Sequence, residues 1–197
     1  TDRFDTADVV AALSATVRNA DSLNAQQAIA ALHDLEAVAN WLDAARAQLV
    51  VAAAGRTPVT AAETKRVTDR SIHDIHACSM GAALGISATS AMNLASMSRN
   101  LVMWLPSTLH LMRSGAIGRT KARLVSDGAT RLYGLLPRSS SPSDLLLAMR
   151  RYERIVTRRI VTASPSDVRK AVAHAHAIIA SASLHENHQA AVEQRYV

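Results

Sequence analysis

The chain has 197 residues, enough to bury a core as one domain or as two small helical layers that share one. Apolar residues make up 49% of the sequence, mostly Ala, Leu and Val, while aromatic residues reach only 3% and the β-branched residues show no sustained alternation. This composition favours closely packed helices and disfavours strands. We therefore expect an all-α fold: a multi-helix bundle of short helices with one long N-terminal helix and helix-turn-helix-like hairpins.

The positive charge of the chain is concentrated in one block. The net charge is +6, but residues 1–112 carry −2, residues 113–170 carry +9 and residues 171–197 carry −1. Such a block favours a polyanionic partner, because Lys and Arg that neutralise phosphates release condensed counterions. A solvated face that keeps the protein in solution, or an interface with an acidic neighbouring domain, would use the same residues.

Cys78 is the one cysteine of the sequence, which excludes an internal disulfide and fits a reducing compartment. No apolar run approaches the roughly 18 to 20 residues that span a bilayer. The opening TDRFDTADVV is not typical of a secretory leader. We expect a cytoplasmic protein without membrane contact, nucleoid-associated if it binds DNA.

Helical spacing predicts a first helix near residues 6–18 and a long one over residues 24–54. The long helix is expected to end at Gly55, which can take the left-handed cap, and before Pro58. The apolar positions that show this spacing in the long helix are Ala28, Leu32, Leu35, Leu42, Ala45 and Leu49.

The sequence ALGIS, residues 83–87, predicts a turn between two helices. Ser71 can cap the first helix, which stops at Gly85, and Ser87 can cap the second. The second helix is expected to bury Ala91, Leu94, Ala95, Met97, Leu101 and Val102. Its outward residues are small and neutral apart from Arg99, whereas a DNA-reading helix needs donors for bases and phosphates. We therefore interpret this hairpin as structural, with base reading, for instance of adenine by Asn93, as the alternative.

Further helices follow in the basic block. Pro106 fits the first turn of a short helix, and residues 116–130 open another. The turn-rich PRSSSPSD, residues 137–144, predicts a loop or linker. It would separate a helical region over residues 1–136 from basic amphipathic helices over residues 145–197 that pack on it.

The helix after this loop is amphipathic. At about 100° per residue its apolar face holds Leu145, Met149, Tyr152, Val156 and Ile160, opposite a face of arginines. A last helix begins with Ser164 as cap and Pro165 at the first helical position.

Ten cationic side chains of the basic block are our candidates for nucleic-acid contact, since the arginine fork matches phosphate geometry. They are Arg113, Arg119, Lys121, Arg123, Arg150, Arg151, Arg154, Arg158, Arg169 and Lys170. No aromatic residues are interleaved with them, which disfavours a platform for stacking single-stranded bases.

Catalytic and metal-binding patterns are absent from the sequence. It has no phosphate-cradling glycine loop, nucleophile elbow or His-centred nuclease motif, so we expect no catalytic residues and no cofactor. Histidines pair at 73/76, 174/176 and 185/188, but no further ligands are fixed nearby, so we expect no metal site.

Two segments resemble a known family. ALGISATSAMNLASMSRNL and LPSTLHLMRSGAIGRTKARLVSDGATRL are similar to the bacterial domain of unknown function 222, the 13E12 repeat family, through a Leu-x-Ile-Ser turn, Leu-Pro-x-Thr-Leu and Gly-x-Ile. The resemblance covers residues 71–132 most closely. It departs at the neutral helix after Ser87, where members frequently carry arginines.

That resemblance implies a helical part with a DNA-linked role, because members commonly carry a C-terminal HNH nuclease domain. It also implies that this chain is a piece of a longer protein or a relative without the nuclease. We expect a module that binds double-stranded DNA through phosphate contacts and is not an enzyme by itself. The alternative is a protein-interaction or dimerisation scaffold, for instance a homodimer, in which residues 24–54 or the face from Leu145 to Ile160 pack on another chain.

Overall fold

The computed structural model describes residues 6–54, 78–136 and 141–193, with side chains at positions 9, 11–54, 78–136 and 141–181. The described residues form helices and no strand, which confirms the all-α prediction. The elements are α1 (Thr6–Arg18), a 3-10 turn (Ala20–Ser22), α2 (Ala25–Ala54), α4 (Ala88–Arg99), the π-helical segment η3 (Asn100–Trp104), α5 (Pro106–Arg113), α6 (Arg119–Leu135), α7 (Pro142–Thr157) and α8 (Pro165–Glu193). Residues 78–84 are also helical and precede α4.

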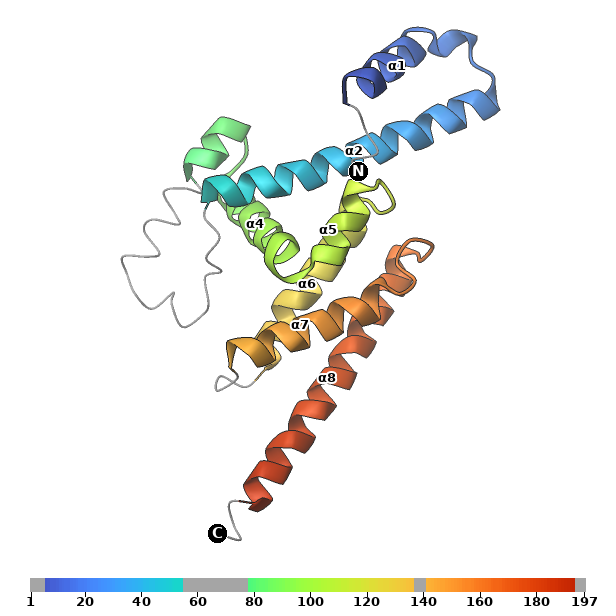
Figure 1. Ribbon diagram of the computed structural model, residues 1–197. Coiled ribbons are helices and arrows are strands. Elements are labelled where there is room, and N and C mark those ends of the chain that lie inside the picture. The colour runs from blue at the N-terminus through green and yellow to red at the C-terminus, as the bar shows by residue number, and fades with distance from the viewer. Residues whose placement is uncertain (1–5, 55–77, 137–140, 194–197) are drawn as a thin grey trace.

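The helices pack in chain order from one end of the molecule to the other (Figure 1). Helices α4 and α5 pack on α2, α6 packs on α5 and η3, and α7 and α8 pack on α6. Helix α1 folds back beside the first part of α2, while the last turns of α8 project away from the bundle. None of the described helices is long and apolar enough to cross a membrane.

Helix α2 packs through small residues. The turn between α5 and α6 rests on it at Gly115, where an added Cβ would lie 2.8 Å from the Cβ of Ala37. Gly115 has a φ of 77°, which suits glycine, and its carbonyl accepts a hydrogen bond of 3.3 Å from Asn40. The buried positions of α2 are Val38, Ala44, Ala47, Val50, Val51 and Ala54.

The long helix forms as predicted, but the leucines that mark its spacing are not its buried side. Leu32, Leu35, Leu42 and Leu49 are 61%, 45%, 55% and 71% exposed. The reason is steric: the turn at Gly115 approaches the backbone of α2 too closely to leave room for leucine, so alanine faces it. The predicted end of α2 at Gly55 and Pro58 lies outside the described residues.

The turn before α4 forms as predicted. Gly85 has a φ of 64°, and the N–H of Ile86 donates to the carbonyl of Gly81 over 2.9 Å, which closes the helix of residues 78–84 in a Schellman arrangement. The hydroxyl of Ser87 then accepts from the N–H of Ser90 and caps α4. Its predicted buried residues Ala91, Leu94, Ala95 and Leu101 are buried, and Met97 and Val102 partly so.

Helix α7 begins earlier than the sequence suggested. Ser141 and Asp144 form a capping box and Pro142 occupies the first turn, so residues 142–144 are helical and not part of a loop. Residues 137–140 lie outside the described part. The cap of α8 by Ser164, with Pro165 as its first residue, agrees with the prediction.

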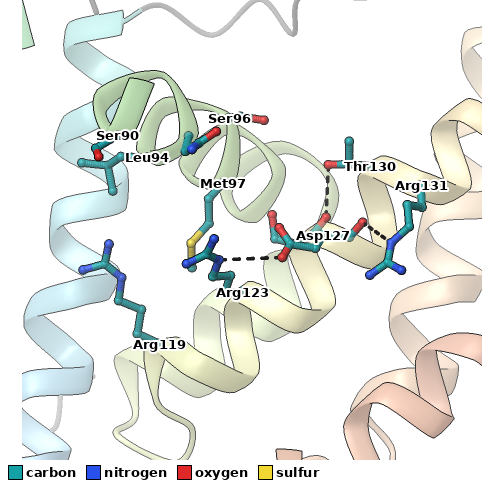
Figure 2. A pocket seen from close by; sticks show the side chains of 11 residues that line it. Ser90, Leu94, Ser96, Met97, Arg119, Arg123, Asp127, Thr130 and Arg131 are labelled. Atoms are coloured by element: carbon teal, nitrogen blue, oxygen red, sulfur yellow. Dashed lines mark hydrogen bonds and ion pairs between the residues drawn. The ribbon is translucent and has the colours of Figure 1, made fainter. Parts of the chain in front are cut away.

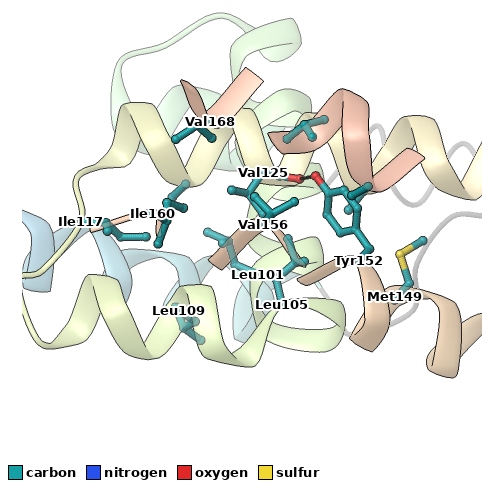
Figure 3. Close-up of a cluster of buried hydrophobic side chains, with 14 of the residues drawn as sticks. Leu101, Leu105, Leu109, Ile117, Val125, Met149, Tyr152, Val156, Ile160 and Val168 are labelled. Carbon is teal, nitrogen blue, oxygen red and sulfur yellow. Dashed lines mark hydrogen bonds between the residues drawn. The ribbon is translucent and has the colours of Figure 1, made fainter. Parts of the chain in front are cut away.

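The main core joins η3 and α5 to α6, α7 and α8, and it also includes Ala44 and Ala47 of α2 (Figure 3). Tyr152 of α7 is fully buried, and its hydroxyl donates to the carbonyl of Val125 over 2.8 Å. Burial raises the pKa of this phenol above its ordinary range. His176 of α8 stacks on Tyr152 with ring centroids 5.6 Å apart, and its Nε2 lies 2.9 Å from the carbonyl oxygen of Gly128. Gly128 lets Tyr152 and Val172 approach α6 because it has no side chain: an added Cβ would overlap the Tyr152 hydroxyl and lie 2.7 Å from Val172.

Glu153 is the one buried charged residue among the described side chains, at 3% exposure. Its carboxylate accepts from the backbone N–H and from the hydroxyl of Thr108, over 2.7 and 3.0 Å. Thr108 lies in the first turn of α5, where unpaired N–H groups and the helix dipole favour a negative charge. Glu153 thereby fixes α7 to the start of α5.

A test of the core compares two glycines of α6. At Gly128 an added Cβ would overlap the Tyr152 hydroxyl and lie 2.7 Å from Val172, so Gly128→Ala should lower the free energy of unfolding by about 2–3 kcal/mol. Gly134 has nothing within 4 Å of such a Cβ, so Gly134→Ala should raise that free energy by up to about 1 kcal/mol. Urea denaturation followed by circular dichroism measures both. Equal effects of the two substitutions would contradict the close packing at Gly128.

Candidate nucleic-acid interface

Four of the ten predicted cations form one exposed surface, which we call the α7 arginine face: Arg150, Arg151, Arg154 and Arg158. Helix α7 buries the opposite side, through Met149, Tyr152 and Val156, so its arginines are directed outward. In the described part of the chain, none of the four guanidinium groups takes part in a hydrogen bond or ion pair. Their guanidinium groups are therefore available to a ligand.

Arg169 and Lys170 lie exposed in the first turns of α8. The ammonium of Lys170 is 3.4 Å from the carboxylate of Asp167, whose pKa is lowered chiefly by its hydrogen bond with Ser164. The negative Asp167 offsets part of the local positive charge. This turn thus contributes less to an anion-binding surface than α7 does.

Lys121 and Arg113 are placed differently from the other candidates. The ammonium of Lys121 donates to the carbonyls of Ile160 and Val161, over 3.0 and 2.8 Å, and so ties α6 to the turn after α7. Those carbonyls follow the end of a helix, where backbone acceptors need a partner. Arg113, at the end of α5, is half-buried. Neither belongs to an open basic surface.

Arg119 and Arg123 lie on a second surface, a cleft between α4 and α6 (Figure 2). Figure 2 shows both side chains extending from α6 on the side that faces α4. The cleft has a volume of about 660 Å³. Its lining comprises Ser90, Asn93, Leu94, Ser96 and Met97 from α4 and Arg119, Arg123, Ser126, Asp127, Thr130 and Arg131 from α6.

Three contacts hold the arginines of this cleft. Arg119 is 3.7 Å from the carboxylate of Asp43 on α2, and Arg123 is 3.7 Å from that of Asp127. The Nε of Arg131 donates to the carbonyl of Asp127 over 3.4 Å. All three contacts are longer than the 2.7–2.9 Å that is typical of a charge-assisted hydrogen bond.

The sequence did not lead us to Arg131, or to the finding that α4 and α6 line one cleft. The spacing of Arg119, Arg123, Asp127 and Arg131 is four residues throughout, which places them along one side of a helix and was a usable signal. Arg99, the cation within α4, does not reach the cleft: it donates to the carbonyl of Ala54 at the end of α2, and burial lowers its pKa. The cations beside α4 come instead from α6.

The histidines form no site among the described residues. His174 is exposed and His176 is held in the core, while His73, His76, His185 and His188 lie outside the side chains that the structure describes. Among the residues that the structure describes, no three His, Cys, Asp or Glu side chains come together in a group that could hold a metal ion.

Comparisons with protein-family models, with curated proteins and with solved structures found no match to this chain. The resemblance of residues 71–132 to the 13E12 repeat family therefore stays a prediction.

The different placements of Lys121 and Arg123 can be tested by stability. Lys121→Met keeps most of the side-chain length but loses both hydrogen bonds to carbonyls, so it should lower the free energy of unfolding by about 1–2 kcal/mol. Arg123→Ala removes an exposed side chain with one loose ion pair and should change it by less than about 0.5 kcal/mol. Denaturant titration distinguishes the two. A neutral Lys121→Met would contradict the structural role of Lys121.

Proposed function

We propose that this chain is a helical module that binds double-stranded DNA mainly through phosphate contacts from the α7 arginine face. The observation that carries the proposal is the set of four exposed arginines on one side of a helix whose other side is fixed in the core. Arginine binds phosphate through a planar fork of N–H donors. A fixed helix holds such donors in place before binding, which reduces the entropy lost on association.

The spacing of the arginines fits a duplex backbone. From Arg150 to Arg158 the helix axis advances about 12 Å at 1.5 Å per residue, and one DNA strand carries a charge about every 3.4 Å. Four cations over that length are close to the charge density of one strand. Such contacts read no sequence, so the proposal is for binding that is largely independent of base order.

Two further features support the proposal. Tyr152, the aromatic residue of α7, is buried in the core and offers no stacking surface, which favours a duplex over single strands. The resemblance to the 13E12 repeat family, a prediction from sequence, also points to a DNA-linked role. The proposal assigns no catalytic step to this chain.

The test removes three arginines together. In Arg150→Gln/Arg154→Gln/Arg158→Gln, the affinity for duplex should fall for all sequences alike, and the slope of log affinity against log salt should shrink by about 3, since each phosphate contact contributes about 0.9. Fluorescence anisotropy between about 50 and 200 mM salt measures both quantities.

The matched control makes the same change in net charge elsewhere. Gln26→Glu/Gln27→Glu/Gln48→Glu adds three negative charges on exposed positions of α2 and should leave the slope unchanged within experimental error. If both variants weaken binding equally, or if the parent chain binds no duplex at low salt, the proposal is wrong.

A second candidate function is a homodimeric scaffold that pairs through α2. Ala28, Leu32, Leu35, Ala39 and Leu42 follow one another at alternating intervals of four and three residues, and Leu49 follows one heptad after Leu42. This is the spacing of a coiled-coil seam, so the partner that fits is a second copy of the same helix. The other interface expected from sequence, from Leu145 to Ile160, is excluded because Met149, Tyr152, Val156 and Ile160 are buried within the chain.

The exposed apolar residues of α2 supply part of the area that such a dimer needs. Burying one Leu or Ile contributes about 1.5–3 kcal/mol, which at about 25 cal/mol/Å² corresponds to about 60–120 Å² each. The five residues are Ile29, Leu32, Leu35, Leu42 and Leu49, and they are 45–71% exposed. Together they therefore offer about 180–360 Å², against an apolar share of about 450 Å² on one side of a standard interface.

Light scattering on the purified chain tests the dimer. The parent should have twice the mass of the monomer, and Leu35→Glu/Leu42→Glu should shift it to the monomer without lowering the helical circular dichroism, because both side chains are exposed within the chain. Leu147→Glu is the control, since it places a charge on an exposed leucine of α7. A monomeric parent at all concentrations rejects this candidate.

A further inference from the structure

The cleft between α4 and α6 combines three arginines with polar groups from a second helix. Its lining carries Arg119, Arg123 and Arg131 against one acid, Asp127, which gives a charge of +2. Its volume of about 660 Å³ lies within the range of about 300–1,000 Å³ that is typical of small-molecule sites. This surface is separate from the α7 arginine face and has its own chemistry.

We propose that this cleft binds the phosphate of a nucleotide unit, with the guanidinium groups of Arg119 and Arg123 on the phosphate and polar groups of α4 on its organic part. Two sources share that chemistry: a free mononucleotide and a phosphodiester of a nucleic acid. The proposal does not rest on DNA binding by α7, so either one can fail alone.

The arginine contacts within the chain leave room for such a ligand. Arg123 and Asp127 are separated by 3.7 Å, and both side chains are more than half exposed, so their mutual attraction is weak. A phosphate oxygen that approaches to about 2.8 Å forms a stronger, charge-assisted and bidentate contact. The guanidinium of Arg119 is about half exposed and lies 3.7 Å from the carboxylate of Asp43, which is also too far for a charge-assisted hydrogen bond, so it too is open to a phosphate.

Helix α4 supplies neutral hydrogen-bonding groups opposite the cations. Among the described residues, the side chains of Asn93 and Ser96 have no hydrogen-bond partner, although both line the cleft. An amide both donates and accepts, as recognition of a base or a sugar hydroxyl requires. Figure 2 shows Met97 between these two sides, where its thioether provides an apolar contact for a ring.

The walls of the cleft are fixed from both sides. The amide of Asn100, at the end of α4, donates to the hydroxyls of Ser126 and Thr130 on α6, over 3.1 and 2.8 Å. Thr130 in turn donates to the carbonyl of Ser126. These hydrogen bonds join α4 and α6 at one end of the cleft, so the arginines and the α4 side chains keep a constant separation.

The experiment is a calorimetric titration of the whole chain with two probes, adenosine 5′-monophosphate and a short DNA duplex. Arg123→Ala should weaken binding of the responsive probe about 10-fold or more, since a hydrogen bond to a charged group contributes about 1.5–3 kcal/mol. Asp127→Asn should strengthen it several-fold, because it removes the one acid of the lining. A folding defect would weaken binding in both variants, so opposite changes in affinity for Arg123→Ala and Asp127→Asn point to the cleft itself.

Matched controls separate the cleft from general charge. Arg18→Ala removes the same charge from α1, outside both basic surfaces, and Glu36→Gln removes an exposed acid from α2. Both should leave mononucleotide affinity within about twofold, as distant surface substitutions do. For the duplex probe, Arg123→Ala is compared with the control that removes an arginine, and Asp127→Asn is compared with Glu36→Gln.

The outcomes are distinct. If the cleft variants change the affinity for adenosine 5′-monophosphate, the ligand is a free nucleotide. If they change only the affinity for the duplex, the ligand is a phosphodiester. If neither probe binds at low salt, or if Arg123→Ala and Asp127→Asn act no differently from their controls, the proposal is overturned. Duplex binding that depends only on the α7 arginine face overturns the cleft and leaves the proposed function standing.

Discussion

The close contact at Gly128 determines how the rest of the molecule presents its charges. Because this residue has no side chain, the Tyr152 ring and α8 can lie directly against α6. That contact fixes the rotation of α6 about its axis: the side with Val125 and Ala129 is buried, and the side with Arg123 is turned toward α4. It also directs the tyrosine side of α7 inward and its arginines outward. One steric constraint in the core thus orients both basic surfaces.

Small residues have the same role elsewhere in the bundle. Gly115 against Ala37 brings the turn before α6 onto α2, and the buried face of α2 consists of alanine and valine. Close approach of backbones stabilises through many dispersion contacts over a short distance. The consequence is that leucine, the larger residue, is left on the outside of α2, which is what makes this helix a candidate for pairing with another copy.

Local signals in the sequence predicted what depends on local structure. Caps at Ser87 and Ser164, the helix end at Gly85 and the inward face of α7 follow from neighbouring residues, and all agree with the structure. The buried side of α2 could not be predicted, since its leucines form a row at helical spacing that stays exposed, while the buried side carries alanine and valine. The cleft and the role of Lys121 also depend on pairs of residues about thirty to forty positions apart. Examples are Asn93 with Arg123 and Lys121 with Ile160. Periodicity within one helix carries no information on such pairs.

The most direct test of the central claim, that exposed arginines of α7 hold a duplex, is to follow the arginine Nε–Hε resonances by NMR while short duplex DNA is added at low salt. The account predicts that the resonances of Arg150, Arg151, Arg154 and Arg158 shift together and return when salt is raised. It predicts no comparable change at Arg18 on α1. Shifts spread evenly over all arginines, or absent from α7, would contradict it.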